Sequence, residues 1–165
     1  MIKTIEFNGQ EYPLFQAEGF ASKFAFPFAL EVCKGVGLDI GCTKKEWALP
    51  GAIPIDKIFN DNCDAMNLPD MVVDYIFSSH CLEHLDNWVE SLDYWTTRIK
   101  KGGVLFLYLP HRSQKYWLPF NNKKHIHYFD QEILREYIES SGKYRNIFIS
   151  GTDLNNSFIV IGERL

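Results

Sequence analysis

Apolar and polar residues alternate along the chain in a way that predicts a mainly parallel sheet covered by helices. Short apolar runs typical of buried strands lie at 36–41, 52–56, 71–77, 103–109, 144–150 and 156–162. Stretches with helical spacing of apolar residues lie at 81–100 and 130–140. Strands that alternate with helices form parallel sheets with helices on both faces. We therefore expect one three-layer α/β/α domain, with an antiparallel hairpin at the sheet edge where Asn155-Asn156 separates the last two strands.

The first 34 residues show a different pattern and are interpreted as an N-terminal arm. Residues 1–15 alternate weakly around Asn8-Gly9, a turn signal of β-hairpins. From Glu18 to Cys33 apolar residues recur at helical spacing, and we expect Pro27 to divide this stretch into two short helices. The chain is thus expected to be a single domain over 1–165 with two parts, an arm over 1–34 and a core over 35–165.

Two consecutive strand ends carry the residues with the clearest functional meaning. Gly37-Leu38-Asp39-Ile40-Gly41-Cys42 reads as a buried strand that breaks into a tight turn, and Pro54-Ile55-Asp56 as a second strand closed by a carboxylate. Glycine at a strand exit lets the backbone approach a ligand, and an acid that closes the next strand can accept hydrogen bonds from ribose hydroxyls. This edge of the sheet is therefore predicted to bind a nucleoside cofactor.

Five short segments stand in a characteristic order along the chain: Leu38-Asp39-Ile40-Gly41-Cys42, Asp56, Asp64-Ala65, Leu82-Glu83-His84-Leu85 and Lys101-Gly102-Gly103-Val104-Leu105. Together they resemble the class I S-adenosylmethionine-dependent methyltransferases, particularly their small type 11 branch. The resemblance covers roughly residues 33 to 162. It implies a Rossmann-like, mostly parallel sheet of the seven-strand type, an enzyme that transfers methyl groups, and S-adenosylmethionine as the cofactor.

The resemblance also implies which residues bind that cofactor. They are Asp39, Gly41 and Cys42 toward its methionine part, Asp56 toward the ribose, Asp64 and Ala65 toward the adenine, and Ser79 and His80 at the exit of the following strand. Ordinary roles compete with these, because a buried Asp39 can tie down the turn and acids such as Asp56 and Asp64 are common in plain loops.

The connection between the first two core strands departs from the family pattern. Only ten residues lie between Gly41 and Ala52. A parallel crossover that includes a helix usually needs at least about 10 to 12 residues. We therefore expect the first crossover helix to be shortened or missing, with Trp47 and Pro50 packed in its place. The glycines missing from this loop motivate an alternative function, a non-catalytic nucleoside-binding or scaffold domain.

His80, Glu83 and His84 provide a competing signal, because they match the H-x-x-E-H pattern of inverted zinc peptidases. That pattern requires a long helix that carries both histidines. Here the apolar run 72–77, which reads as a strand, leads directly into the three residues. We therefore rank a zinc hydrolase below a methyltransferase and expect no metal.

The acceptor is expected to bind beyond the cofactor. His80 is the first candidate for a general base, and His111 the second. Segment 111–129 is long and aromatic, and we expect it to form a lid over the acceptor site. The residues expected to contact the substrate are His111, Trp117, His125 and His127, although Trp117 could simply pack the loop onto the domain.

The net charge and the cysteines indicate which binding partners and which cellular compartment to expect. The net charge of −4 argues against nucleic acid, which basic surfaces bind, and favours a small-molecule acceptor. Cysteines 33, 42, 63 and 81 form no C-x-x-C pair, which suits reduced thiols. No apolar signal core or membrane-length run is present, so we expect a soluble cytoplasmic protein.

Overall fold

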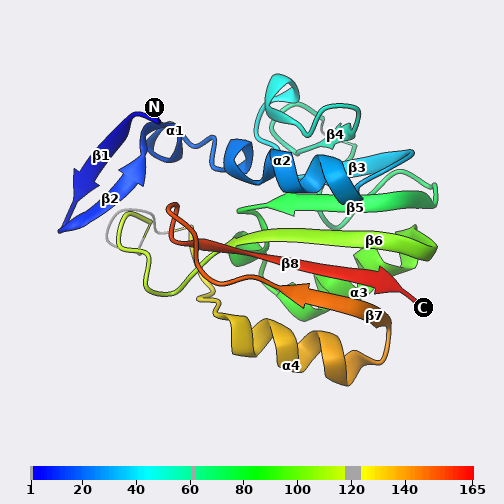
Figure 1. The fold of residues 1–165 in the computed structure, drawn as a ribbon. Coiled ribbons are helices and arrows are strands. Elements are labelled where there is room, and N and C mark those ends of the chain that lie inside the picture. The colour runs from blue at the N-terminus through cyan, green and yellow to red at the C-terminus, as the bar shows by residue number, and fades with distance from the viewer. Residues whose placement is uncertain (1, 61, 118–123) are drawn as a thin grey trace.

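The computed structural model describes residues 2–60, 62–117 and 124–165, and its main feature is a mixed sheet (Figure 1). Its strands are β3 (Gly37–Ile40), β4 (Ile53–Ile55), β5 (Val73–Ser79), β6 (Ile99–Pro110), β7 (Tyr144–Ile149) and β8 (Ser157–Arg164). Within the described ranges they form one six-stranded sheet in the order β4-β3-β5-β6-β8-β7. Only β8 runs antiparallel to its neighbours. The expected mostly parallel sheet with an antiparallel edge is confirmed.

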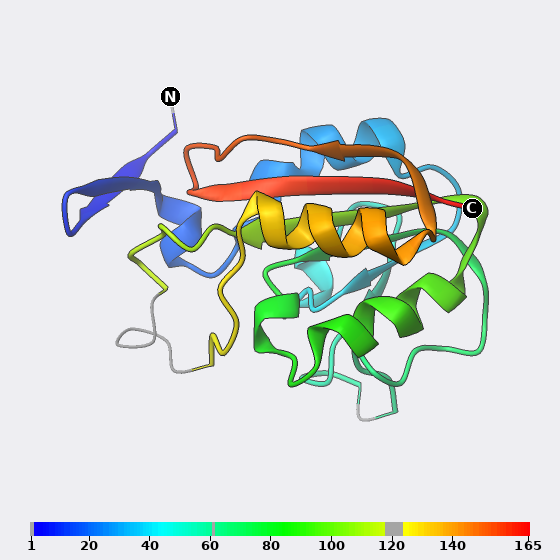
Figure 2. The same ribbon diagram turned by 90° about the horizontal axis from the view of Figure 1, so that it is seen from below.

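Three helices cover the two faces of this sheet, as Figure 2 shows from below. They are α2 (Ser22–Val32), α3 (Trp88–Arg98) and α4 (Gln131–Ser141). On the α2 side, Ala21, Ala25 and Ala29 belong to one core cluster with aromatic residues of the sheet such as Phe77 and Phe106. The opposite core cluster joins α3 and α4 to the other face of the same strands. The three-layer arrangement therefore follows from the alternation of side chains along each strand.

The sheet has one strand fewer than the seven-strand type, within the residues described. Positions 56–60 and 62–72, between β4 and β5, form turns and an isolated bridge between Asp64 and Asn67. This segment is rich in Asn and Asp, whose side chains bond to nearby backbone and favour turns. It therefore contributes loops to the strand ends instead of a further strand.

The expected helix over 81–100 is wrong in its extent. Leu82–His84 forms a single 3-10 turn, called η2, and α3 begins only at Trp88. The N-cap is Asn87, whose side chain accepts a hydrogen bond of 3.2 Å from the backbone N–H of Glu90. Leu85 is already extended, so the chain leaves β5 through a turn before the helix starts.

Pro27 does not divide the N-terminal helical stretch. A short helix α1 (Leu14–Ala17) comes first, and α2 then runs continuously through Pro27. Proline inside a helix removes one backbone hydrogen bond. Because Ala25 and Ala29 on either side of it are fully buried, packing of α2 on the sheet outweighs that loss.

The expected N-terminal hairpin is present and projects beyond the sheet (Figure 1). It consists of β1 (Thr4–Phe7) and β2 (Gln10–Pro13), joined by Asn8 and Gly9, which both adopt positive φ. Tyr12 of the hairpin is fully buried, and its hydroxyl accepts hydrogen bonds from the backbone of Lys115 and Tyr116 at 2.8 and 3.3 Å. The arm is thus attached to the loop that follows β6.

The connection between β3 and β4 contains no α-helix, as expected, and only the 3-10 turn η1 (Lys45–Trp47). Trp47 stacks on Phe20 with a ring distance of 4.9 Å. Cys42 and Leu49 of this loop are buried, whereas Pro50 is exposed. Trp47 and Leu49 therefore pack in place of the missing crossover helix, and the expectation for Pro50 was wrong.

Two further properties concern the described residues as a whole. All four cysteines are free. No helix among these residues is long and apolar enough to cross a membrane.

Candidate functional site

The carboxyl ends of the parallel strands meet at one edge of the sheet, and a large cavity opens there. Gly41 follows β3, Asp56 follows β4 and His80 follows β5. The cavity, called the strand-end cavity below, has a volume of about 1190 Å³. Cavities for one drug-sized ligand measure about 300–1,000 Å³. The strand-end cavity therefore has room for more than one small molecule, where open α/β sheets bind their ligands.

The structure brings together most, but not all, of the site residues expected from the sequence. Those that line the strand-end cavity are Gly41, Asp56, Asp64, Ala65, His80, Trp117 and His125. Those that lie outside its lining are Asp39, Cys42, Ser79, His111 and His127. Their roles toward a ligand stay predictions.

The turn after β3 requires glycine. Gly41 has a φ of +85°, and a Cβ there would lie 2.5 Å from both Cβ and Sγ of Cys81. Its N–H donates to the carbonyl of Ile55 at 2.8 Å. Both the left-handed backbone and the contact with Cys81 exclude a side chain, so the turn stays narrow and its backbone borders the cavity.

Asp56 organises the loops at the end of β4. Its Oδ2 accepts a hydrogen bond of 2.8 Å from the N–H of Thr43, and its Oδ1 accepts one of 2.9 Å from the N–H of Ile58. A carboxylate oxygen can accept more than one hydrogen bond. The half-buried carboxylate is therefore held in a fixed orientation and still has acceptor capacity toward the cavity.

Asp39 plays the structural role that the sequence left open. It is 1% exposed, and its Oδ2 accepts a hydrogen bond of 2.6 Å from the N–H of Leu49. Burial raises the pKa of Asp39 to about 7, the bond from Leu49 opposes the shift, and the charge of Asp56 adds to it. Asp39 thus ties the shortened β3–β4 loop to the core.

Asp64 and Ala65 form a rigid turn on the opposite side of the cavity. Asp64 Oδ1 accepts a hydrogen bond of 2.7 Å from the N–H of Met66. The carbonyl of Ala65 accepts one of 2.6 Å from the indole N–H of Trp95 in α3. Helix α3 therefore holds the turn that was expected to contact adenine.

Three histidines surround one buried carboxylate in the cavity wall. Glu83 is fully buried, and its Oε1 lies 3.9 Å from His80 Nδ1, 3.9 Å from His84 Nε2 and 3.8 Å from His125 Nε2. Burial raises the pKa of Glu83 to about 8. Burial also lowers the pKa of His80 to about 3 and that of His125 to about 4, with contributions from neighbouring histidines. At neutral pH these imidazoles are neutral.

His111 and His127 lie next to this group but outside the strand-end cavity. Both line a small adjoining cavity, together with Trp117 and His125. His111 Nδ1 is 2.7 Å from the hydroxyl of Ser113, and His127 Nε2 is 2.8 Å from the carbonyl of Leu85. His80 is therefore better placed than His111 to act on a ligand in the large cavity.

The segment expected to form a lid is described only at its two ends, since positions 118–123 lie outside the described residues. At one end Trp117 lines the cavity, with its ring 6.2 Å from that of His125. At the other end, the N–H groups of Ile126 and His127 donate to the carbonyl of Glu83 at 3.0 and 3.2 Å. Both ends thus lie against the cavity wall.

Gln16 and Glu83 are the residues that sequence reasoning missed as members of the site. Gln16 is fully buried and lines the cavity, and its amide has no hydrogen-bond partner within the described part of the chain. Gln16 lies in α1, within the arm, where no motif marked it. Glu83 did belong to a recognised motif, but its burial among histidines depends on the distant segment 124–127.

Comparison with known proteins agrees with this architecture. A family model described as a methyltransferase domain matches residues 18–143, which is most of the chain. No curated protein sequence matches it. Many solved structures share the fold.

Three of these structures illustrate the likeness. A SAM-dependent methyltransferase from Archaeoglobus fulgidus is 19% identical, with a TM-score of 0.63 over 92% of this chain and 99% of that one. A possible histamine N-methyltransferase from Thermotoga maritima is 15% identical, with a TM-score of 0.66 over 92% and 96%. The N-methyltransferase NodS from Bradyrhizobium japonicum, in complex with S-adenosyl-L-homocysteine, is 13% identical, with a TM-score of 0.60 over 91% and 87%.

The similar solved structures support the fold, and the match to the family model supports membership of the family. The expected resemblance is confirmed, since the match runs from the start of the helical stretch that contains α2 to the end of α4. The chain belongs to the methyltransferase domain family.

Proposed function

We propose that this chain transfers a methyl group from S-adenosylmethionine to a small-molecule acceptor. The observation that carries the proposal is the half-buried Asp56 carboxylate, held by two backbone amides in the wall of the strand-end cavity. An acid in this place, at the end of the second core strand, suits the ribose of a nucleoside cofactor. Family membership and the S-adenosyl-L-homocysteine bound to NodS support the same cofactor.

The residues around Asp56 fit such a cofactor. The Gly41 turn presents backbone without a side chain, and the Asp64-Ala65 turn faces the same cavity. When bound, the cofactor supplies an electrophilic methyl group on a sulfonium. The protein then has to orient the acceptor and exclude water from it.

The acceptor side of the cavity is lined by His80, His84, Trp117 and His125. His80 is the candidate base at this side because it borders the cavity. Burial lowers its pKa to about 3, so the ring is neutral at pH 7 but a weak base, and the nearby Glu83 would have to stabilise a proton that it takes up. His80 Nε2 lies 2.9 Å from the hydroxyl of Ser157, which holds the ring in place. A proton taken up by this ring would face Glu83 at Nδ1.

Calorimetry with S-adenosyl-L-homocysteine tests the cofactor assignment. We expect one site per chain, and a loss of about 1 to 3 kcal/mol of binding free energy in Asp56→Ala, the usual effect of losing hydrogen bonds to a charged group. Asp70→Ala is the matched control, because the Asp70 side chain is fully exposed and lies outside the cavity lining. Equal affinity in wild type and a folded Asp56→Ala variant would remove the ribose assignment.

A non-catalytic nucleoside-binding domain is the second candidate, and the β3–β4 loop that lacks an α-helix favours it. Incubation with methyl-labelled cofactor and pooled small metabolites separates the two. Label uptake that disappears with Asp56→Ala supports methyl transfer. Binding of S-adenosyl-L-homocysteine with no uptake into any pool supports the scaffold.

A further inference from the structure

The Glu83 carboxylate presents a problem of charge and hydrogen bonding. It is fully buried, and neither of its oxygens has a hydrogen-bond partner among the described residues. Buried carboxylates are normally paired or hydrogen-bonded, because an unpaired one is costly. Something outside the described residues should therefore satisfy Glu83.

Imidazole nitrogens of three histidines lie close to Glu83 Oε1. Nε2 of His84 and Nε2 of His125 lie 3.9 and 3.8 Å from Oε1, too far for hydrogen bonds. The two rings are themselves in edge contact, with centroids 4.6 Å apart. The three donor atoms all lie within 4.8 Å of one another.

The tautomer of His84 is determined by its other nitrogen. Nδ1 lies 2.8 Å from the backbone carbonyl of Lys124, and a carbonyl oxygen can only accept a hydrogen bond. Nδ1 therefore carries the proton, and Nε2 directs a lone pair toward the Glu83 carboxylate. A proton or a metal cation can lie between a lone pair and a carboxyl oxygen, and the separation of 3.9 Å is too long for a hydrogen bond but leaves room for a metal ion.

We propose that Glu83, His84 and His125 bind a divalent transition-metal ion in the wall of the strand-end cavity. Two imidazoles and one carboxylate form a donor set of catalytic zinc sites and also of iron(II) sites. The bond from His84 Nδ1 to a backbone carbonyl is the outer contact that orients metal-binding histidines in general. This inference replaces the expectation from sequence that no metal is bound.

Small side-chain rotations would complete the site. In a tetrahedral zinc site the donor atoms lie about 3.3 to 3.5 Å apart, given metal–ligand bonds of about 2.0 to 2.2 Å. The present spacing of 3.8 and 3.9 Å to Oε1 is therefore slightly open. His84 and His125 both line the cavity, so a fourth position on the metal faces the space where the acceptor is proposed to bind.

The proposed site differs from the H-x-x-E-H zinc motif considered from the sequence. That motif pairs His80 with His84 on one long helix, whereas η2 is a single 3-10 turn. The site uses His125 instead, from the segment that follows β6. The proposal does not imply hydrolysis, and it stands independently of which cofactor the cavity holds.

Metal binding can be measured directly on the full chain. The protein is purified with its affinity tag removed, treated with EDTA, dialysed, and titrated with ZnCl₂ by calorimetry and by thermal melting. We expect one zinc per chain with micromolar or tighter affinity, and a melting temperature that rises with zinc concentration. Failure to bind zinc or iron(II) at one equivalent below about 100 μM would overturn the proposal.

Variants locate the metal. Glu83→Gln and His84→Ala should weaken zinc binding by roughly 100-fold or more, beyond the 10–100-fold typical of losing an outer partner. His111→Ala is the matched control and should bind zinc as the wild type does, because His111 lies outside this cluster. Unchanged zinc affinity in folded Glu83→Gln and His84→Ala also overturns the proposal. S-adenosyl-L-homocysteine calorimetry on the zinc-free protein shows separately whether the proposed function fails.

Discussion

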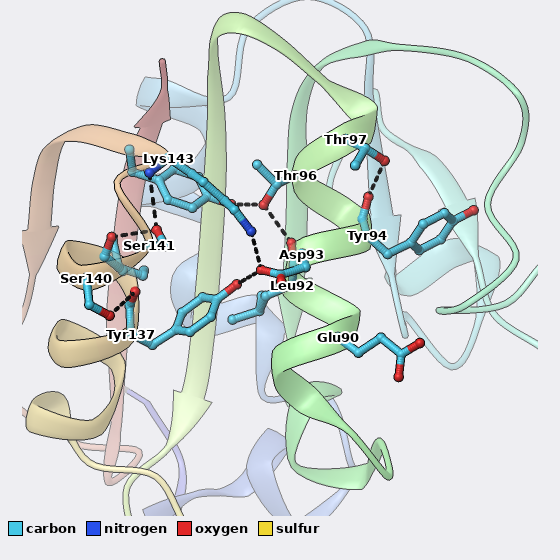
Figure 3. A network of polar contacts seen from close by, with 12 residues as sticks. Glu90, Leu92, Asp93, Tyr94, Thr96, Thr97, Tyr137, Ser140, Ser141 and Lys143 are labelled. Atoms are coloured by element: carbon cyan, nitrogen blue, oxygen red, sulfur yellow. Dashed lines mark hydrogen bonds and ion pairs between the residues drawn. The ribbon is translucent and has the colours of Figure 1, made fainter.

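Two groups of buried or half-buried polar side chains in this protein differ in how completely they are bonded. The first joins α3, α4 and β7 on one side of the sheet (Figure 3). There Asp93 accepts hydrogen bonds from the hydroxyl of Tyr137 and, at 2.5 Å, from Lys143 Nζ. The hydroxyl of Thr96 donates to the carbonyl of Leu92 at 2.6 Å and is bonded to the hydroxyl of Tyr144.

The second group lines or underlies the strand-end cavity, and its polar atoms lack such partners. Glu83 and Gln16 are both fully buried, and neither side chain is hydrogen-bonded to a described residue. Thr96 and Tyr144 of the first group are buried as well, so burial alone does not explain the missing partners. The completed network explains its buried side chains without a ligand, whereas the unsatisfied side chains of the second group agree with the ligand sites proposed above.

Residues with positive φ also distinguish the strand-end cavity from the rest of the described chain. Among the described non-glycine residues with positive φ, Asn8, Asn146 and Asn156 are of a type that tolerates it. Thr43, which is β-branched, has a φ of 64°, and His80, of a type that tolerates positive φ better, has a φ of 49°; both line the strand-end cavity. Strain of this kind collects at functional sites, and its position agrees with the unpaired side chains.

The largest effect is expected where the cavity edge has no room for a side chain. Gly41→Ala should lower the free energy of unfolding by about 3 kcal/mol or more, since overpacking against Cys81 adds to a left-handed φ. Gly51→Ala is the control, because Gly51 has a φ of +88° but open space around its Cβ. It should lose only about 1 kcal/mol. Chemical denaturation measures both, and equal losses would show that contact with Cys81 does not matter.

A smaller effect is expected from the ionisation of Asp39. Burial raises its pKa from 3.8 to about 7, so between these values the folded state holds a proton that the unfolded state has released. The stability contributed by Asp39 is thus present below pH 4 and is lost as pH rises through 7.

From pH 5 to pH 8, the wild type should therefore lose about 2 kcal/mol relative to Asp39→Asn, which cannot ionise but can still accept the bond from Leu49. Denaturation curves at several pH values measure this difference. His80 and His125 titrate in both proteins and cancel in it. A constant difference across the range would contradict the assigned ionisation.

The two polar groups should respond oppositely to isosteric substitution. Thr96→Val removes a hydroxyl from the completed network and leaves Tyr144 unpaired, which should cost about 1 to 2 kcal/mol. Glu83→Gln, measured with EDTA present, removes no bond formed within the described residues and should leave stability unchanged or slightly raised. If Glu83→Gln is the more destabilising of the two, the contrast between the groups is wrong.

The smallest effect on binding is expected for Trp117. Trp117→Ala should lower turnover on the true acceptor but change S-adenosyl-L-homocysteine affinity by less than about 0.5 kcal/mol, because Trp117 lies beside His125, on the side of the cavity proposed for the acceptor. Calorimetry and thermal melting check this. Joint loss of cofactor affinity and melting temperature would instead make Trp117 a core residue.

Much of the fold could be predicted because each core strand is a continuous apolar run and the order of strands constrains their pairing. The errors arose where local signals compete. Ser79 and Asn87 are both reasonable helix caps, and only the extended turn at Leu85 decides between them. Pro27 normally interrupts a helix, and only the contact of α2 with the aromatic face of the sheet overrides it.

The site could be predicted to the extent that it lies directly at strand ends. Gly41, Asp56 and His80 follow strands whose parallel order brings them together. Gln16 and Glu83 could not be found in this way, because their surroundings come from segments far away in the sequence. Whether a polar side chain is satisfied depends on those distant partners, and no local pattern records it.

The N-terminal hairpin is hydrogen-bonded to the stretch that follows β6. Gln10 Nε2 donates to the carbonyl of Ser113 at 3.3 Å, and Lys115 Nζ donates to the carbonyl of Asn8 at 3.0 Å. The stretch that leads to Trp117 is therefore held by the arm, whereas the β3 and β4 turns are held by the sheet. Insertions or replacements in the hairpin would therefore act first on the wall proposed for the acceptor, and would leave the turns proposed for the nucleoside in place. If those proposals hold, the two halves of the cavity can evolve, or be engineered, separately.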